Sequence, residues 1–269
     1  MTRRVRSFGW PGMLLLVALG STTATAQERL ERTAYARLLD AHVRPVTIAG
    51  IQLNAVDYAA LPADPPYAQA ISDLASAHLE VLPSDAARIA FWVNAYNLLA
   101  IKAVVDHYPV PSIKDGGSLL QPIWKRRVGR VAGRDYTLDE IEHDILRARF
   151  HEPRVHMAIV CASLSCPDLR LEPYEAERLG VQLDDAARRF LANPTKGLQP
   201  GPDGRTVRVS SIFKWFAEDF GGLEGVIRFI RATADPVVAG RLADLDGRGL
   251  SYLTYDWSLN DIRRAGAHR

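Results

Sequence analysis

The apolar positions of the chain recur mainly at helical spacing. That spacing predicts helices over residues 28–42, 67–78, 85–107, 138–150, 175–191, 212–220 and 223–233. Short apolar runs between turn residues predict strands over 126–131, 154–160, 206–209 and 250–255. Helices outnumber strands and do not alternate with them regularly. The pattern therefore favours one α+β domain, mostly helical, with a small mixed or antiparallel sheet.

The predicted helix over 85–107 is apolar around most of its circumference, which is typical of a buried central helix. Asn94 and Asn97 fall away from its narrow charged strip. A buried amide without a hydrogen bond costs about 1–3 kcal/mol, so both side chains need partners. Either they bind backbone groups of a neighbouring element, or one of them orients a catalytic imidazole or lines a pocket.

Turn and cap residues support several of these boundaries. Ser84 is a suitable N-cap for the central helix, and Thr137 with Glu140 forms a capping box before the helix over 138–150. The turn over 202–205 (PDGR) suits a hairpin just before the strand at 206.

The first 26 residues have the pattern of a secretory signal peptide. Three arginines at positions 3, 4 and 6 precede an apolar stretch over 13–19, and small residues lead to a cleavage site near Ala26–Gln27. The apolar stretch is too short to span a bilayer, so we expect an exported, periplasmic protein without a transmembrane segment in its mature form. We expect an N-terminal helical extension over 27–85 packed on a main domain over 86–260, and a frayed tail over 261–269.

Composition adds limits on function. The chain is 48% apolar with a formal net charge of +2, and three of its arginines belong to the signal peptide. It shows no basic stripe, no interleaving of aromatic and basic residues and no zinc-finger spacing, which argues against nucleic acid as a partner. We expect a small-molecule or peptide ligand, no cofactor and no metal.

Both cysteines lie in the segment over 156–167 (HMAIVCASLSCP), which holds the strongest candidate chemistry. In an exported protein, paired cysteines usually form a disulfide. Five residues of extended chain separate two Cα atoms by roughly 17 Å, so a bridge between Cys161 and Cys166 requires the residues between them to fold back as a tight loop. The residues leave open a disulfide, a functional thiol or two inert buried cysteines.

A thiolate at Cys161 needs a base, and the candidate histidines lie upstream of it. His156 precedes it by five residues, so on an ideal strand the two side chains point to opposite faces. His143 lies off the main apolar stripe of its predicted helix. Each histidine is either a hydrogen-bonded structural residue or the base.

Five ordered segments of the chain resemble the domain-of-unknown-function family 547 (DUF 547). They are 91–97 (FWVNAYN), 138–147 (LDEIEHDILR), 153–167 (PRVH running into CASLSCP), 212–220 (IFKWF with DF) and 255–260 (YDWSLN). The resemblance covers about residues 86–260 and implies one shared domain, found in exported bacterial proteins and in plant proteins, with no established activity. It also favours Cys161 over Cys166 as the functional thiol and argues against an obligatory disulfide, because plant members keep the first motif cysteine more readily.

Two classes of function follow. In a thiol-dependent hydrolase or acyl or amide transferase, Cys161 attacks the substrate and His143 or His156 carries the proton. Asn94, Asn97 or Asp256 orients the imidazole.

In a non-catalytic periplasmic binding or assembly module, the aromatic motifs over 213–216 and 255–257 line a groove, and Arg170 or Lys214 contacts an acidic ligand. The alternative for each of these two residues is a charged group in solvent on a side chain whose apolar part is packed. A redox-active Cys161–Cys166 pair is a third possibility, although its spacing differs from CxxC.

Overall fold

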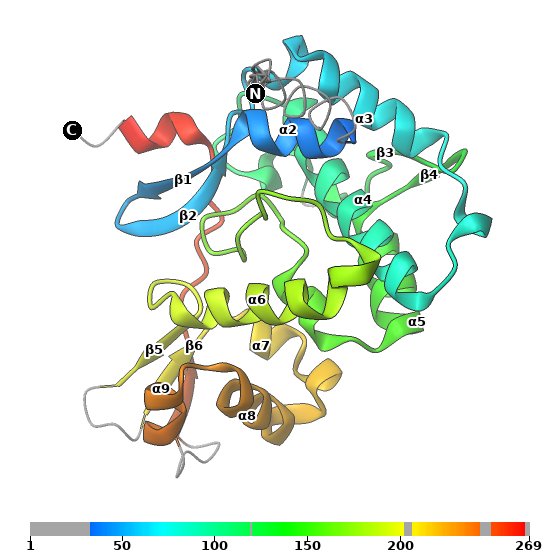
Figure 1. Cartoon of the computed structure of the whole chain (residues 1–269). Helices are drawn as coiled ribbons and strands as arrows, with labels where there is room; N and C mark the ends of the chain where they lie inside the picture. Colours follow the sequence, from blue (N-terminus) through cyan, green and yellow to red (C-terminus); the bar gives the residue numbers. More distant parts are fainter. Residues whose placement is uncertain (1–32, 119, 202–205, 243–248, 267–269) are drawn as a thin grey trace, which may run out of the picture. The chain divides into compact units, whose positions relative to one another are not determined.

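The computed structural model describes residues 33–118, 120–201, 206–242 and 249–266, which belong to one compact unit (Figure 1). The predicted signal peptide and the start of the first predicted helix lie outside these residues. The described helices are α2 (Ala34–His42), α3 (Pro65–Ala75), α4 (Asp85–Val105), α5 (Ala148–Phe150), α6 (Leu179–Ala192), α7 (Ile212–Trp215), α8 (Gly222–Thr233) and α9 (Pro236–Arg241). A π-helix over Glu140–Arg147 runs directly into α5.

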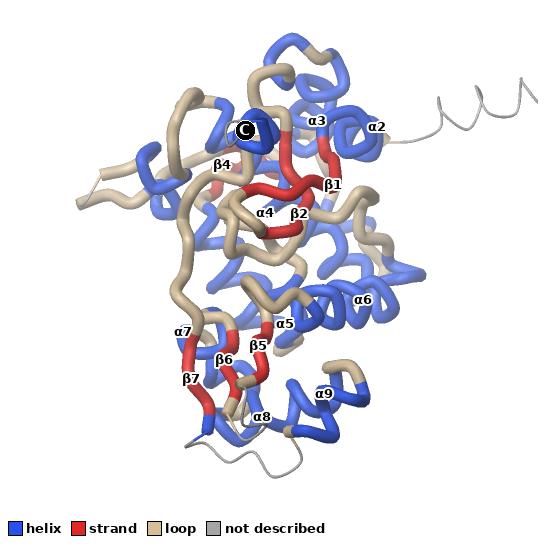
Figure 2. Tube along the Cα trace, turned by 90° about the vertical axis from the view of Figure 1, so that its left-hand side faces the viewer, coloured by secondary structure: helices blue, strands red, loops and turns tan. Residues whose placement is uncertain are grey.

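The strands form three small sheets. An antiparallel hairpin joins β1 (Val43–Ile48) to β2 (Ile51–Val56), and a second joins β3 (Gly129–Val131) to β4 (Arg134–Tyr136). In the third sheet, β6 (Val207–Val209) pairs antiparallel with β5 (Leu198–Pro200) and parallel with β7 (Leu250–Tyr252), side by side in Figure 2. The chain is therefore the expected α+β domain, mostly helical with small antiparallel and mixed sheets.

Helix α4 forms the centre of the larger of two main apolar clusters, as its pattern predicts. Of its 21 residues 14 are buried, and Ser84 caps it by accepting a hydrogen bond from the amide of Ala87 at 3.2 Å. Among the described helices, α4 is long and apolar enough to cross a membrane, with a mean hydropathy of 1.2. Its burial among the other elements accounts for that composition.

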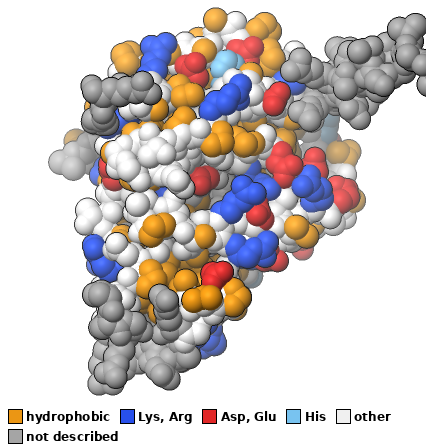
Figure 3. Space-filling model, turned by 60° about the vertical axis from the view of Figure 1, so that its left-hand side comes forward, with side chains coloured by type: hydrophobic (Ala, Val, Ile, Leu, Met, Phe, Trp, Pro, Cys, Tyr) orange, Lys and Arg blue, Asp and Glu red, His pale blue; other side chains and the backbone are white. Residues whose placement is uncertain are grey.

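A second apolar cluster joins α6 and α8 to the three-stranded sheet. The segment over 153–166 lies between the two clusters, because Met157 packs in the second while its neighbours Val155 and Ala158 pack in the first. Tyr255 packs against both clusters. On the face shown in Figure 3, acidic and basic side chains are interspersed, with hydrophobic side chains between them.

The strand predicted over 154–160 is wrong. Residues Pro153–Met157 form a 3-10 helix, with Pro153 in its first turn and the Glu152 side chain accepting a hydrogen bond from the amide of Arg154. A proline at a helix start and an acidic N-cap favour this turn, although the run is short and apolar. The expectation that His156 and Cys161 point to opposite faces of a strand no longer applies.

Candidate functional site

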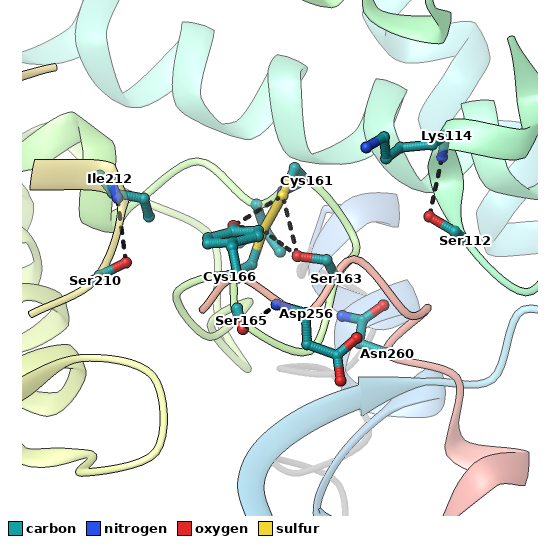
Figure 4. The surroundings of a disulfide bond; sticks show 12 residues. Ser112, Lys114, Cys161, Ser163, Ser165, Cys166, Ser210, Ile212, Asp256 and Asn260 are labelled. Carbon is teal, nitrogen blue, oxygen red and sulfur yellow. Dashed lines mark hydrogen bonds between the residues drawn. A yellow bond between two sulfur atoms is a disulfide. The ribbon is translucent and has the colours of Figure 1, made fainter. Parts of the chain in front are cut away.

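Cys161 and Cys166 form a disulfide, with their Cα atoms 6.2 Å apart (Figure 4). The intervening residues fold back as the bridge requires, because Ala162 adopts a φ of 60° and the amide of Cys166 donates to the carbonyl of Ser163 at 3.2 Å. Neither cysteine is a free thiol. Cys161 is partly exposed and Cys166 is buried, so the sulfur of Cys161 is the more accessible of the two.

The hydroxyl of Tyr255 contacts both sulfurs, at 3.3 Å from Cys161 Sγ and 3.2 Å from Cys166 Sγ. Burial raises the pKa of this phenol, and the charge of Glu142 raises it further. Tyr255 therefore remains a neutral hydrogen-bond donor beside the disulfide.

Glu142 lies on the π-helix, and its carboxyl group is largely buried. Its side chain is 15% exposed, and the hydroxyl of Tyr96 on α4 donates to its Oε2 at 3.3 Å. Burial raises the pKa of Glu142 to about 7, because desolvation disfavours the charged form more than its partners favour it. At neutral pH this carboxyl group can therefore both give and accept a proton.

His156 lies between Glu142 and Asp219. Its Nε2 is 2.6 Å from Asp219 Oδ2, its Nδ1 is 4.0 Å from Glu142 Oε1, and its ring stacks on Phe216 with centroids 4.1 Å apart. Only 1% of the side chain is exposed, and burial lowers its pKa, so the imidazole is neutral at pH 7. A neutral ring that donates from Nε2 to Asp219 leaves the lone pair of Nδ1 directed towards Glu142.

Arg147 completes the cluster by binding Asp219 through two nitrogens, at 2.5 and 2.8 Å. Burial alone would raise the pKa of Asp219, but the hydrogen bonds from His156 and Arg147 outweigh burial and lower it. Arg147 also contacts His143 Nδ1, and His143 Nε2 is 3.6 Å from Asp139. Asp219 therefore stays ionised and fixes the orientation of both the guanidinium and the imidazole.

The structure places His143 and His156 together, near Arg147 and Asp219. In the part of the chain that the structure describes, no hydrogen bond joins either histidine to a cysteine sulfur. Burial lowers the pKa of His143, whose side chain is 38% exposed.

The two asparagines of α4 bind backbone groups. Asn97 donates to the carbonyl of Ala158 at 3.0 Å and accepts from the amide of Val160 at 2.8 Å. Asn94 binds the carbonyl and the amide of Tyr174 in the same way. Asn97 therefore fixes the backbone just before Cys161.

The remaining predicted residues lie in other surroundings. The backbone amide of Asp256 donates to Ser165 Oγ at 2.8 Å, and its carboxylate accepts from the amide of Ser258, so Asp256 shapes the loop beside the disulfide. Arg170 is largely buried in ion pairs with Glu172 and Asp185. The ammonium group of Lys214 lies 5.8 Å from the ring centroid of Tyr252.

Five residues of this site were not among the sequence candidates: Tyr96, Glu142, Arg147, Asp219 and Tyr255. Each of them lies within one of the five segments that carry the family resemblance. What distinguishes these five residues is that the segments come together in space, and this is known only from the folded chain. Across the described ranges, no group of three histidine, cysteine or acidic side chains could hold a metal ion.

Residues 81–191 match the family model described as "Protein of unknown function, DUF547". This segment contains α4, the π-helix, the disulfide and most of α6. This match supports the resemblance to the DUF547 family over that part of the chain. Comparisons with curated proteins and with solved structures find no match.

Proposed function

We propose that the protein is a hydrolase or an acyl or amide transferase whose proton transfers are carried by Glu142. The observation that carries this proposal is the arrangement of His156 between two carboxylates, with Nε2 2.6 Å from Asp219 and Nδ1 4.0 Å from Glu142. Glu142 is more accessible than His156, at 15% against 1% exposure. We therefore assign Glu142 as the catalytic residue, and His156 and Asp219 as positioning residues.

In this mechanism, the ionised Glu142 takes a proton from a water molecule as that water attacks the acyl carbon of the substrate. The protonated carboxyl group then returns the proton to the leaving amine, thiol or alcohol as the bond to the acyl carbon breaks. A pKa of about 7 suits both steps at neutral pH. The neutral imidazole of His156 lies beside the carboxyl group without adding a second positive charge next to Arg147.

The test is turnover of chromogenic acyl esters, thioesters and aminoacyl anilides by the purified mature chain. We expect turnover of at least one of these classes, and a loss of about 100-fold or more in Glu142→Gln. Glu177→Gln is the matched control, because Glu177 is exposed and lies outside the cluster. Activity that survives in Glu142→Gln would overturn the proposal, and no turnover of any class would leave the binding module as the better hypothesis.

A second candidate is a thiol-dependent enzyme that works only in its reduced form. The contact of the Tyr255 hydroxyl with both sulfurs favours it, because a hydrogen bond from this neutral phenol would stabilise a thiolate at Cys161. An external dithiol would convert the disulfide to two thiols and become oxidised itself, and Cys161 would then be the accessible nucleophile. Activity that appears only with a dithiol and disappears in Cys161→Ser would support this candidate over attack by water.

We also propose that the protein is exported, with a signal peptide cleaved near Ala26–Gln27. The disulfide supports this proposal, because such bridges persist in oxidising compartments. N-terminal sequencing of the protein from a periplasmic fraction should give a mature chain that begins near Gln27. An intact N-terminus in the cytoplasmic fraction would contradict export.

A further inference from the structure

A cavity of about 550 Å³ is lined in part by the π-helix, through Glu140, Asp144 and Ile145, and by none of the residues of the Glu142 cluster. This volume is within the range of small-molecule sites, roughly 300–1,000 Å³. Its apolar part contains the buried side chains of Trp92, Tyr136 and Ile145 and the partly buried Phe150. An apolar side chain of a ligand can therefore leave water in this cavity.

Four charged side chains at the cavity are already paired. Arg88 binds Asp85 at 2.9 Å, and Arg134 binds Glu140 at 3.1 Å. Arg134 also stacks over the ring of Tyr136, with its guanidinium carbon 4.5 Å from the ring centroid. These pairs neutralise each other and contribute no net charge to the cavity.

Asp144 and Arg149 also line the cavity, and they differ from the four paired charges in their lack of an ion-pair partner in the described part of the chain. Within the described residues, neither forms an ion pair or a side-chain hydrogen bond, and both are exposed. Asp144 lies on the π-helix and Arg149 on α5, and both residues line the cavity. One negative and one positive charge are therefore available at a cavity that also has an apolar part.

We propose that this cavity binds a free amino acid with an apolar side chain, which places its carboxylate on Arg149 and its ammonium group on Asp144. A guanidinium binds a carboxylate with two parallel hydrogen bonds, and a carboxylate accepts hydrogen bonds from an ammonium group. A ligand with only one of these charges would leave the other protein charge without a partner. The apolar side chain would pack on Trp92 and Phe150. This site is independent of the function proposed for Glu142.

Calorimetric titration of the mature chain with three probes tests the proposal. L-phenylalanine carries both charges, N-acetyl-L-phenylalanine lacks the ammonium group, and L-phenylalaninamide lacks the carboxylate. We expect L-phenylalanine to bind and each of the other two to bind about tenfold more weakly, because each loses one charge-assisted hydrogen-bonded contact.

Two variants assign the contacts. Arg149→Gln should weaken L-phenylalanine and N-acetyl-L-phenylalanine about tenfold and leave L-phenylalaninamide unchanged. Asp144→Asn should weaken L-phenylalanine and L-phenylalaninamide and leave N-acetyl-L-phenylalanine unchanged. Arg228→Gln is the control, because Arg228 is 68% exposed and does not line the cavity.

Both substitutions are at exposed positions, so the variants should fold, which a thermal unfolding curve verifies. Binding of L-phenylalanine by Glu142→Gln should equal that of the wild type, which separates this site from the proposed active site. No measurable binding of L-phenylalanine, or equal losses with all three probes in Arg149→Gln, would overturn the proposal.

Discussion

Replacing Glu142 with glutamine should make the stability of the protein less dependent on pH. The pKa of Glu142 is raised from 4.5 to about 7, so between these values the native state binds more protons than the unfolded state. Stability contributed by this group is therefore lost as pH rises through that window. Glutamine stays neutral at every pH, retains the shape of the protonated carboxyl group and can still accept the hydrogen bond from Tyr96.

The size of the effect follows from these two values. Relative to a carboxyl group that never ionises, the free energy of unfolding of the wild type is lowered by about 0.8 kcal/mol at pH 5 and by about 3.3 kcal/mol at pH 8. The difference in the free energy of unfolding between Glu142→Gln and the wild type should therefore grow by about 2.5 kcal/mol, in favour of the variant, from pH 5 to pH 8. The groups that act on Glu142 from the surrounding elements, and that the variant leaves in place, are Tyr96, Asp139, Arg147, His156, Asp219 and Tyr255.

Urea unfolding at the two pH values, followed by circular dichroism, measures this difference. Glu177→Gln serves as the control and should follow the wild type at both pH values, because Glu177 is exposed. A difference between Glu142→Gln and the wild type that is the same at pH 5 and at pH 8 would refute the assignment of a raised pKa to Glu142.

Three further predictions concern stability. Asp219→Asn should cost about 2–4 kcal/mol in urea unfolding at pH 7, because it removes the charge between a guanidinium and a buried imidazole, and a loss below about 0.5 kcal/mol would contradict this. The Cys161→Ser/Cys166→Ser double variant should lose only about 2 kcal/mol under non-reducing conditions, because the bridge closes a short loop; an unfolded variant would contradict it. Lys196, which is 1% exposed, forms an ion pair at 2.6 Å with Asp168, which is 29% exposed. Lys196→Met should cost less stability than Asp168→Asn, because only the second change leaves a buried charge, the lysine, without its partner; the reverse order in thermal unfolding would contradict this.

Sequence rules for single helices predicted the features that depend on one helix alone. The capping box formed as predicted, with the amide of Thr137 donating to Glu140 Oε2 at 2.8 Å and the amide of Glu140 donating to Thr137 Oγ1 at 3.0 Å. The central helix also followed from its composition, since only a buried helix is apolar on nearly every side.

Local rules failed where the backbone departs from the common pattern. The β1–β2 hairpin was missed because its turn is Ala49–Gly50, with φ values of 49° and 79°, in place of the usual Asn-Gly. The apolar run after Pro153 predicts a strand where the structure has a 3-10 helix, because a short buried 3-10 turn can have the same composition as a short buried strand.

The site itself depends on contacts between distant parts of the chain. Asp219 lies 63 positions from His156 and 72 from Arg147, and no spacing rule relates such positions. Glu142 is one of several acids on an acidic helix, and its sequence neighbours do not indicate that folding buries it. The pairing of Cys161 with Cys166 depended likewise on whether the intervening loop folds back.

The most direct measurement is the titration of Glu142 itself. The protein is labelled with ¹³C at the glutamate carboxyl carbon, and the chemical shift is followed from pH 3 to pH 9, with the Glu142→Gln spectrum identifying the resonance. A proton-transfer group at neutral pH should titrate with a midpoint near the value of about 7 that its burial gives. A midpoint near 4.5, the value for an unperturbed glutamate, would contradict the assignment of Glu142 as the catalytic acid and base.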